Sequence, residues 1–457
     1  MNHTANDAVN GSTSDAANEP MGDAMRALEL SVEGRLDGLS PAALSRLFDR
    51  DPGDASDVSR TVRRLIADVR DQGDPALVEM AKRFDGVQLT GIEVPWDSWD
   101  AAVQALPPEV RQALLRAADN IRRFHAAQVP SELVFDVEPG VRITRAVTPL
   151  EKVGVYAPGG TAAYPSSVLM GVVPARAAGV GEVIVCSPPG PDGVPPDEVI
   201  AACAIAGADR LFTVGGAGAI AALAFGTETI PAVDGIVGPG NRWVDEAKRQ
   251  VAGRVVIDCP AGPSEVLVVA DDSANATWAA HELLAQAEHD PDAACVLVTT
   301  SERTARECRE ALGRLLAEAP RAEIAREALA SAGAILLANS DTDAFDFAQR
   351  YAPEHLSIMT AGGVDDARRV RTAGTTFVGG HASVAFGDYL TGANHVLPTN
   401  GRSRSFSGLS VQQFLRSYTI QEVTSEGAAA MAEDVATLAR SERLPAHAAA
   451  ALARSAT

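Results

Sequence analysis

Two adjacent residues, Glu354 and His355, are the sharpest candidates for chemistry in this sequence. They stand in the segment YAPEHLSIM, just after a proline and just before an apolar run typical of a strand. A carboxylate beside an imidazole could activate a water molecule and carry a proton near neutral pH. Neighbours in extended backbone point to opposite sides, so both face one cavity only if the chain turns there. For the dipeptide alone, a capping glutamate and a half-buried histidine are the commoner explanation.

A possible metal site begins in the segment LLAQAEHDPD. Gln286 and His289 are three positions apart on a predicted helix and therefore share a face. With Asp388 and the distant His447 they form a mixed set of oxygen and nitrogen ligands, which zinc accepts. A glutamine ligand is unusual, so the spacing alone favours no metal. His281 lies off that face, and we expect it to be a surface or packing histidine.

The segment FGDYLTGANHVLPT (386–399) carries Asp388 together with His395. Its glycines and proline suit an irregular conformation of the kind that forms sites. Two potential ligands in one short glycine-bearing stretch weaken the alternative, an ordinary surface loop.

Three glycine-rich turns follow predicted strands: YAPGG (156–160), VGGAGA (214–219) and VGPGN (237–241). Residues 216–221 fit the pattern G-x-G-x-x-A at the start of a helix, where backbone N–H groups can hold a pyrophosphate. No acidic residue stands in a convincing position after the next strand. Tight packing turns therefore explain the match equally well.

The elements that must position these residues form two series of alternating strands and helices. The first has strands at KVGVYAP, 182–187, 210–214 and 234–238, with helices at 166–179, 196–207 and 219–226. The second has strands at 265–271, 294–300, 334–339 and 375–380, with helices near 274–288, 302–330 and 341–350. Such alternation predicts β-α-β units and a mostly parallel, doubly wound sheet in each series.

The predicted fold class is α/β, with two doubly wound Rossmann-like modules, a helical N-terminal segment and a small C-terminal extension. Helical pattern runs from Pro41 to Gln128, and two short extended stretches follow near 132–137 and 141–148. The extension is too short for a core of its own and must dock on another surface. The expected division is a disordered tail (1–25), a helical segment joining the first α/β domain (26–155), a second Rossmann-like domain on the cofactor side (156–262), the first domain continued with the Glu-His and ligand motifs (263–410), and the extension (411–457).

Composition excludes several classes of function. The formal net charge is −21 and is spread along the chain, so the surface repels phosphate backbones and argues against nucleic-acid binding. No apolar run approaches the ~20 residues that cross a bilayer, and the first residues lack the basic and apolar regions of a signal peptide. The cysteines lack C-x-x-C spacing and are expected to be buried small hydrophobes in a protein of the reducing cytoplasm. They are Cys186, Cys203, Cys259, Cys295 and Cys308.

Taken together and in this order, the motifs resemble the histidinol dehydrogenase family from about Ser40 to His447. The matching stretches include VGVYAPGG, VGGAGAIAALAFGTETI, VGPGN, DCPAGPSEVLVVAD, LLAQAEHD, YAPEHLSI, GDYLTGANHVLPT, FSGLSV and SERLPAH. The resemblance implies oxidation of L-histidinol to L-histidine through a bound aldehyde, with two NAD and one water.

The resemblance also implies the site residues and the assembly. Glu354 and His355 would do the acid/base work, and one Zn²⁺ per active site would bind to Gln286, His289, Asp388 and His447. Substrate contacts would fall at Ser264, Gln286, His289, His355, Asp388, His395, Glu442 and His447. NAD contacts would fall at Tyr156, Gly218 and Asn241. The family enzyme is a homodimer, which would place Glu442 and His447 in the partner's site and agrees with a tail that cannot stand alone.

The sequence departs from the family pattern at two places. Gly218 stands where the family usually has a glutamine that contacts NAD, so the side-chain contact expected there is missing. The stretch HASVAFGDY replaces the usual S-P-E-S-type segment, so His381 is not carried over as a site residue.

Two other readings remain open from the sequence. One is a related zinc and NAD dehydrogenase that acts on another small alcohol, such as a sulfonated propanediol. The other is a zinc-bound relative without turnover. His395, Glu442 and the run NHVLPT favour histidinol, and the intact Glu354 and His355 argue against loss of activity.

Overall fold

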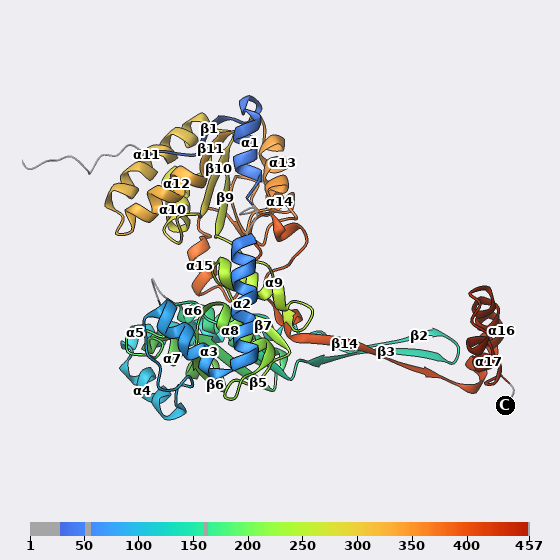
Figure 1. The fold of residues 1–457 in the computed structure, drawn as a ribbon. Helices are drawn as coiled ribbons and strands as arrows, with labels where there is room; N and C mark the ends of the chain where they lie inside the picture. Colours follow the sequence, from blue (N-terminus) through green and yellow to red (C-terminus); the bar gives the residue numbers. More distant parts are fainter. Residues whose placement is uncertain (1–27, 51–55, 160–162, 456–457) are drawn as a thin grey trace, which may run out of the picture.

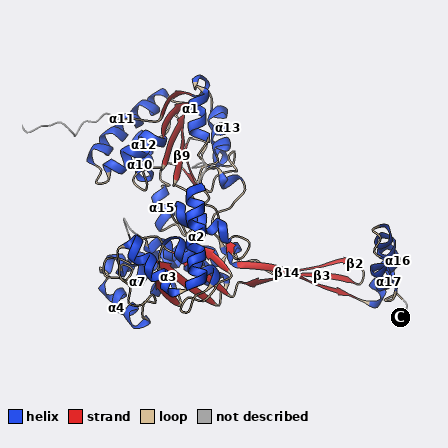
Figure 2. Ribbon diagram, in the orientation of Figure 1, coloured by secondary structure: helices blue, strands red, loops and turns tan. Residues whose placement is uncertain are grey.

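The computed structural model describes residues 28–50, 56–159 and 163–455. Within these ranges the chain forms three sheets, two of them parallel and covered by helices, and one antiparallel. The two parallel sheets lie in separate lobes, and the antiparallel sheet forms an arm that leads to a pair of helices (Figures 1 and 2). The predicted α/β class with two doubly wound modules is confirmed. The tail expected at 1–25 lies outside the described residues.

The first lobe is built on a six-stranded sheet with the order β1-β11-β10-β9-β12-β13. Its strands are β1 (Val32–Arg35), β9 (Glu265–Ala270), β10 (Ala294–Thr299), β11 (Gly333–Leu337), β12 (His355–Met359) and β13 (Thr375–Val378). Its helices are α1 (Pro41–Phe48), α10 (Ala276–Ala287), α11 (Glu302–Glu318), α12 (Ala322–Ala332), α13 (Asp341–Tyr351) and α14 (Val364–Ala367). Helices α10 to α12 pack on one face and α1 and α13 on the other. Because both faces are covered, the central strands are continuous apolar runs.

The second lobe is built on a five-stranded parallel sheet with the order β6-β5-β4-β7-β8. Its strands are β4 (Lys152–Tyr156), β5 (Glu182–Ser187), β6 (Arg210–Thr213), β7 (Gly235–Val237) and β8 (Val256–Ile257). The helices between them are α6 (Pro165–Ala178), α7 (Asp197–Ala206), α8 (Gly216–Phe225) and α9 (Arg242–Val251).

The N-terminal segment 26–155, expected as a helical unit joining the first domain, is divided between the lobes. Its first elements, β1 and α1, lie on the six-stranded sheet. Four later helices pack on the five-stranded sheet instead, because their apolar faces complete its two cores. These are α2 (Ser56–Gln72), α3 (Asp74–Met80), α4 (Trp99–Ala105) and α5 (Pro108–Ala126).

One helix expected from the sequence is two helices in the structure. The stretch 302–330 divides into α11 and α12. Pro320 stands between them, and the residue before a proline disfavours the helical conformation, so the first helix ends there.

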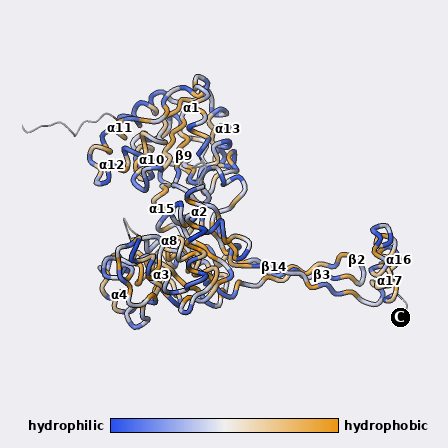
Figure 3. The backbone as a smooth tube through the Cα atoms, in the orientation of Figure 1, coloured by the Kyte–Doolittle hydropathy of each residue, from blue (hydrophilic) through white to orange (hydrophobic). Residues whose placement is uncertain are grey.

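The arm is an antiparallel sheet with the order β14-β3-β2, and it ends in two helices. Its elements are β2 (Leu133–Glu138), β3 (Val141–Pro149), β14 (Leu415–Val423), α16 (Ser425–Ser441) and α17 (Pro445–Leu452). The helix pair buries a small cluster of Ala436, Ala439 and Ala448. Hydrophobic stretches run along the arm in Figure 3, and the β2 side chain of Phe135 is 60% exposed. Such a strand needs a partner surface.

In the described part of the chain, every helix is too short or too polar to cross a lipid bilayer. All five cysteines are buried and free, and burial raises the pKa of each thiol. The expectation that the cysteines are small buried residues is confirmed.

Candidate active site

The expected site residues gather at one edge of each parallel sheet. Glu354 and His355 lie at the amino end of β12, next to the start of β9. Gln286 and His289 lie at the same edge, since α10 returns from the far edge and ends at Ala287. The three glycine-rich turns follow β4, β6 and β7, at the carboxyl edge of the five-stranded sheet. Ligands of doubly wound sheets usually bind at that carboxyl edge.

The chain turns just before Glu354 and His355, as expected if both side chains are to face the same site. Ala352 adopts a left-handed conformation with φ of 53° after α13, and His355 then begins β12. Oε2 of Glu354 lies 3.4 Å from Nδ1 of His355, and both side chains are buried. On the other side of the ring, Nε2 of His355 lies 3.7 Å from Oδ1 of Asp388.

The main chain of Glu265 orients both members of the pair. Its N–H donates to Oε2 of Glu354 at 2.7 Å, and its carbonyl accepts from Nδ1 of His355 at 3.0 Å. A carbonyl only accepts, so Nδ1 carries a proton and the neutral ring presents Nε2 as the base. Nε2 is buried and has no hydrogen-bond partner within the described ranges. In the neutral form of the ring, Nε2 is therefore the atom of His355 that can take a proton.

Charge at this edge controls the protonation of His355. Burial opposes a charged imidazole, but the carboxylates of Glu354 and Asp388 outweigh it and raise the pKa of His355 to about 9. The two carboxylates thus stabilise an imidazolium ion at the centre of the site.

Two residues of this edge were not predicted: Glu265 and Arg50. The Glu265 carboxylate is buried and accepts hydrogen bonds from the N–H of Asn400 at 2.8 Å and of Glu354 at 3.3 Å. Nη1 of Arg50 lies 2.6 Å from Oε2 of the same carboxylate. A glutamate placed directly before the apolar run VLVVA was the available signal for Glu265, whereas nothing in the sequence marks Arg50.

Of the four expected metal ligands, Asp388 lies close to His355, and Gln286 and His289 lie at the same edge of the sheet. Gln286 is buried, and its Oε1 has no hydrogen-bond partner among the residues that the structure describes. Asp388 lies in α15 (Val384–Tyr389), which sits between the lobes in Figure 1 and is tied to α10 because Oε2 of Glu282 accepts from the N–H of Val384 at 2.9 Å. His289 is exposed just beyond α10. Buried polar atoms rarely lack a partner, so Oε1 of Gln286 fits a missing ligand.

The fourth expected ligand is elsewhere. His447 lies in α17 at the end of the arm, and Glu442 caps α16 beside it (Figure 1). Both are exposed. Accordingly, residues 28–50, 56–159 and 163–455 contain no cluster of three His, Cys, Asp or Glu side chains ready to hold a metal.

The remaining substrate candidates lie at the site edge. Ser264 directly precedes Glu265, and its carbonyl accepts from the N–H of Ala294 at 3.0 Å. Nδ1 of His395 lies 3.0 Å from the carbonyl oxygen of Asp388. Burial lowers the pKa of His395 against the opposing charge of Asp388, which keeps this imidazole neutral.

The cofactor candidates help to shape the glycine-rich turns. Tyr156 is buried, and its hydroxyl accepts from the N–H of Gly216 at 3.1 Å, at the start of α8. Burial raises the pKa of Tyr156 to about 12. Asn241 is exposed and caps α9, its Oδ1 accepting from the N–H of Trp243 at 3.1 Å. At Gly218 a Cβ atom would lie 2.8 Å from Sδ of Met80, so this methionine fills the space beside the glycine.

A buried ion pair fixes the third turn. Nζ of Lys248 lies 2.7 Å from Oδ1 of Asp258 and also donates to the carbonyl of Gly238. Oδ2 of Asp258 accepts from the N–H of Gly238 at 2.8 Å. Gly238 has φ of 117°, and a Cβ there would lie 2.1 Å from the carbonyl oxygen of Tyr156. Only glycine fits this close approach.

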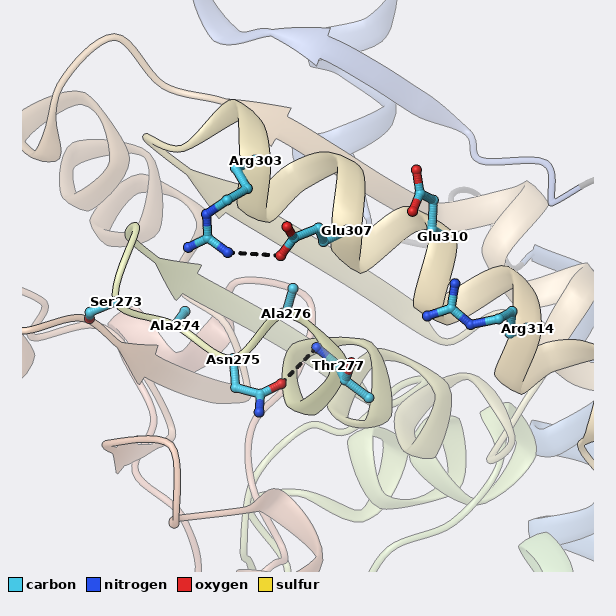
Figure 4. Close-up of a pocket in the computed structure, with 9 residues that line it drawn as sticks. All are labelled: Ser273, Ala274, Asn275, Ala276, Thr277, Arg303, Glu307, Glu310 and Arg314. Carbon is cyan, nitrogen blue, oxygen red and sulfur yellow. Dashed lines mark hydrogen bonds and ion pairs between the residues drawn. The ribbon is translucent and has the colours of Figure 1, made fainter.

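A hollow between the start of α10 and α11 lies away from these residues (Figure 4). It opens at the carboxyl edge of the six-stranded sheet, whereas Glu354 and His355 lie at the amino edge. Its charged side chains are those of Arg303, Glu307, Glu310 and Arg314. Nη1 of Arg303 lies 2.8 Å from Oε2 of Glu307, so these two charges form a surface ion pair.

Comparison with known proteins gives one consistent result. The family model described as histidinol dehydrogenase matches residues 48–455. The chain is 47% identical to histidinol dehydrogenase of Methanosarcina mazei over 91% of its own length and 95% of that protein. It is 48% identical to that of Halobacterium salinarum over 91% and 97%. The crystal structure of histidinol dehydrogenase from Elizabethkingia anophelis matches with a TM-score of 0.88 and 35% identity, covering 93% of this chain and 98% of that one.

Proposed function

The chain belongs to the histidinol dehydrogenase family, and from this premise we propose that it oxidises L-histidinol through L-histidinal to L-histidine, with NAD as hydride acceptor. The observation that carries the proposal is the pair at the start of β12. Oriented by Glu265, the pair offers a carboxylate and a free imidazole Nε2 within one buried site. General acid–base chemistry requires this combination.

In the first step the alcohol becomes an aldehyde. Nε2 of His355 accepts the hydroxyl proton while the hydride on the same carbon passes to NAD. Asp388, 3.7 Å from Nε2, stabilises the imidazolium ion that results. The histidine then releases its proton to solvent before the second step.

In the second step the aldehyde becomes an acid and one water is consumed. Glu354 accepts a proton from water as the oxygen attacks the aldehyde carbon, and this proton then passes to the former aldehyde oxygen, which gives a neutral hydrate and restores the carboxylate. His355 takes a hydroxyl proton of the hydrate while a second hydride passes to a second NAD. The N–H of Glu265 holds the Glu354 carboxylate in place for this task.

A zinc ion would be held by Gln286, His289 and Asp388 of one chain and by the partner subunit's His447. The unpartnered Oε1 of Gln286 and the mixed oxygen and nitrogen donors support this assignment. Bound zinc would act as a Lewis acid that binds the imidazole and amine of the substrate and so fixes the position of the alcohol carbon. A divalent cation beside Asp388 would also offset the charge that raises the pKa of His355.

The active form is a homodimer in which the arm of each chain reaches the other's site. The exposed arm and the small core of α16 and α17 support this proposal, because both leave apolar side chains such as Phe135 and Leu438 uncovered. Phe386 and Tyr389 flank Asp388 on α15 and are each 57% exposed. They form an apolar surface beside the site that the arm of a partner chain could bury. The partner subunit's Glu442 would then contact the substrate.

NAD would bind at the carboxyl edge of the five-stranded sheet, with contacts from Tyr156 and Asn241. Gly218 contributes backbone only. The ion pair of Lys248 and Asp258 keeps the turn before Asn241 rigid, which supports this location.

The proposal is tested by NAD reduction with two substrates, L-histidinol and a sulfonated propanediol. We expect kcat/KM for L-histidinol to exceed that for the diol by several orders of magnitude. A site built to bind an imidazole and an amine leaves its polar groups unpaired with the diol. Preference for the diol would assign the protein to the paralogous activity. If neither substrate is oxidised, the protein would be a zinc-binding relative without turnover.

A further inference from the structure

A buried carboxylate beside the catalytic pair has no part in the steps above. Glu265 is 1% exposed, yet it lies at the start of a strand whose other residues are apolar. A charge in such a place is costly unless several groups compensate it. The groups that contact the Glu265 carboxylate indicate its structural role.

Glu265 and Glu354 are joined by two reciprocal hydrogen bonds. The Glu265 carboxylate accepts from the N–H of Glu354 at 3.3 Å, and the Glu354 carboxylate accepts from the N–H of Glu265 at 2.7 Å. The Glu265 carbonyl meanwhile accepts from His355. The side chain of Glu265 therefore holds the backbone of Glu354. The main chain of Glu265 orients the Glu354 carboxylate and the imidazole of His355.

Arg50 compensates the charge and extends the contact to the turn before the pair. Its guanidinium is within 2.6 Å of the Glu265 carboxylate, lies over the ring of Tyr351 at 3.6 Å from the centroid, and donates to the Tyr351 carbonyl. Tyr351 is the last residue of α13, and the left-handed Ala352 follows it. Arg50 thus holds the start of the turn that delivers Glu354 and reaches the end of that turn only through Glu265.

The opposite side of the carboxylate is bound to the segment after the Asp388 loop. Oε1 of Glu265 accepts from the N–H of Asn400, whose own φ is 56°. The carboxylate at the start of β9 therefore joins three other segments: the chain after α1 at Arg50, the turn after α13 at Glu354, and the chain at Asn400. An apolar residue at 265 would leave the N–H groups of Glu354 and Asn400 without acceptors.

We propose that Glu265, paired with Arg50, is a positioning residue for the reaction and acts through Glu354. This inference rests on the proposed role of Glu354 as the group that activates water. Glu265 touches no reacting atom; it sets where the Glu354 carboxylate stands. Small displacements of a catalytic group cost about 10²-fold in rate, so its removal has a measurable effect.

A double-mutant cycle tests the proposal with histidinal as substrate. Glu265→Gln is expected to lower kcat for aldehyde oxidation about 10- to 100-fold and to leave the KM for NAD unchanged. In a Glu354→Gln background the same substitution is expected to change kcat less than about 3-fold, because the group it positions is already gone. An equal loss in both backgrounds, or none in either, would overturn the proposal.

Two further variants keep the cycle interpretable. Glu246→Gln alters another buried glutamate, which pairs with Arg249 on α9, and its effect is expected to be the same in both backgrounds. If Glu265→Gln does not fold, Arg50→Lys replaces it, since lysine keeps the charge and loses the simultaneous contact with Tyr351. A wild-type protein that does not oxidise histidinal would instead contradict the proposed function, so the two failures are distinct.

Discussion

Gln286 and His447, two of the four residues expected to bind one metal ion, lie in separate parts of the molecule. Gln286 is near the end of α10, at the edge of the six-stranded sheet where Glu354 and His355 lie, and His447 is in α17 at the end of the arm (Figure 1). The amide oxygen is buried without a partner in the described structure, whereas the imidazole is exposed. A second chain would satisfy both, which leads to the first prediction.

Mixed dimers of two inactive variants are expected to recover activity. His355→Ala and His447→Ala are each expected to inactivate both sites of the proposed homodimer. In a mixed dimer, the site with His355 of one chain and the partner subunit's His447 is intact. Random pairing of co-expressed, differently tagged chains gives about a quarter of the wild-type activity in a two-fold symmetric assembly. No recovery in purified mixed dimers would mean that each site is built within one chain.

Purified protein is expected to contain about one zinc ion per chain, measured by elemental analysis. A chelator should remove the metal and the activity together, and added zinc should restore both. His289→Ala should lose zinc on dialysis. The matched control is His281→Ala, which alters an exposed histidine of α10, the helix that ends just before His289, and should keep its zinc. Full activity without a divalent metal would eliminate the zinc proposal.

Glu354→Gln is expected to damage the two oxidation steps unequally. Only the aldehyde step consumes water, so its rate should fall by ~10²–10⁴ while alcohol oxidation changes much less. His355→Ala should slow both steps, because a proton leaves oxygen in each. Separate rates with histidinol and histidinal measure the difference. Equal losses in Glu354→Gln would limit the carboxylate to holding His355 or the substrate.

Restoring a glutamine at position 218 is expected to tighten NAD binding once space is made. Met80 occupies that space, since a Cβ at Gly218 would lie 2.8 Å from its Sδ. Against Met80→Ala alone, the double variant Met80→Ala/Gly218→Gln should lower the KM for NAD about 2- to 10-fold, as one hydrogen bond would. The KM for histidinol should not change. If the KM for NAD also stays constant, position 218 does not contact the cofactor.

The alternating strands and helices could be predicted because both faces of each parallel sheet are buried. Runs such as EVLVVA and ACVLVT have no other stable setting, and their observed limits differ from the predicted ones by a residue or two. The N-terminal helices illustrate the limit of this reasoning. Periodicity predicts that α2 is amphipathic, but not which sheet its apolar face will cover.

The candidate site could be predicted only where residues able to do acid–base chemistry stand close together in a short segment. Glu354 and His355 could be found in this way, and Arg50 could not, because its partner Tyr351 is 301 positions away along the chain. Glu265 carried a weak signal, a charge directly before an apolar strand. Long-range contacts of this kind depend on how the lobes fold, and single-sequence patterns do not report them.

The product balance of the reaction tests the central claim most directly. Purified protein is incubated with a limited, known amount of L-histidinol and excess NAD, and the NADH formed is compared with the amino acid recovered. The proposed mechanism predicts two NADH and one L-histidine for each L-histidinol consumed. One NADH per histidinol with histidinal accumulating, or no NADH at all, would contradict it.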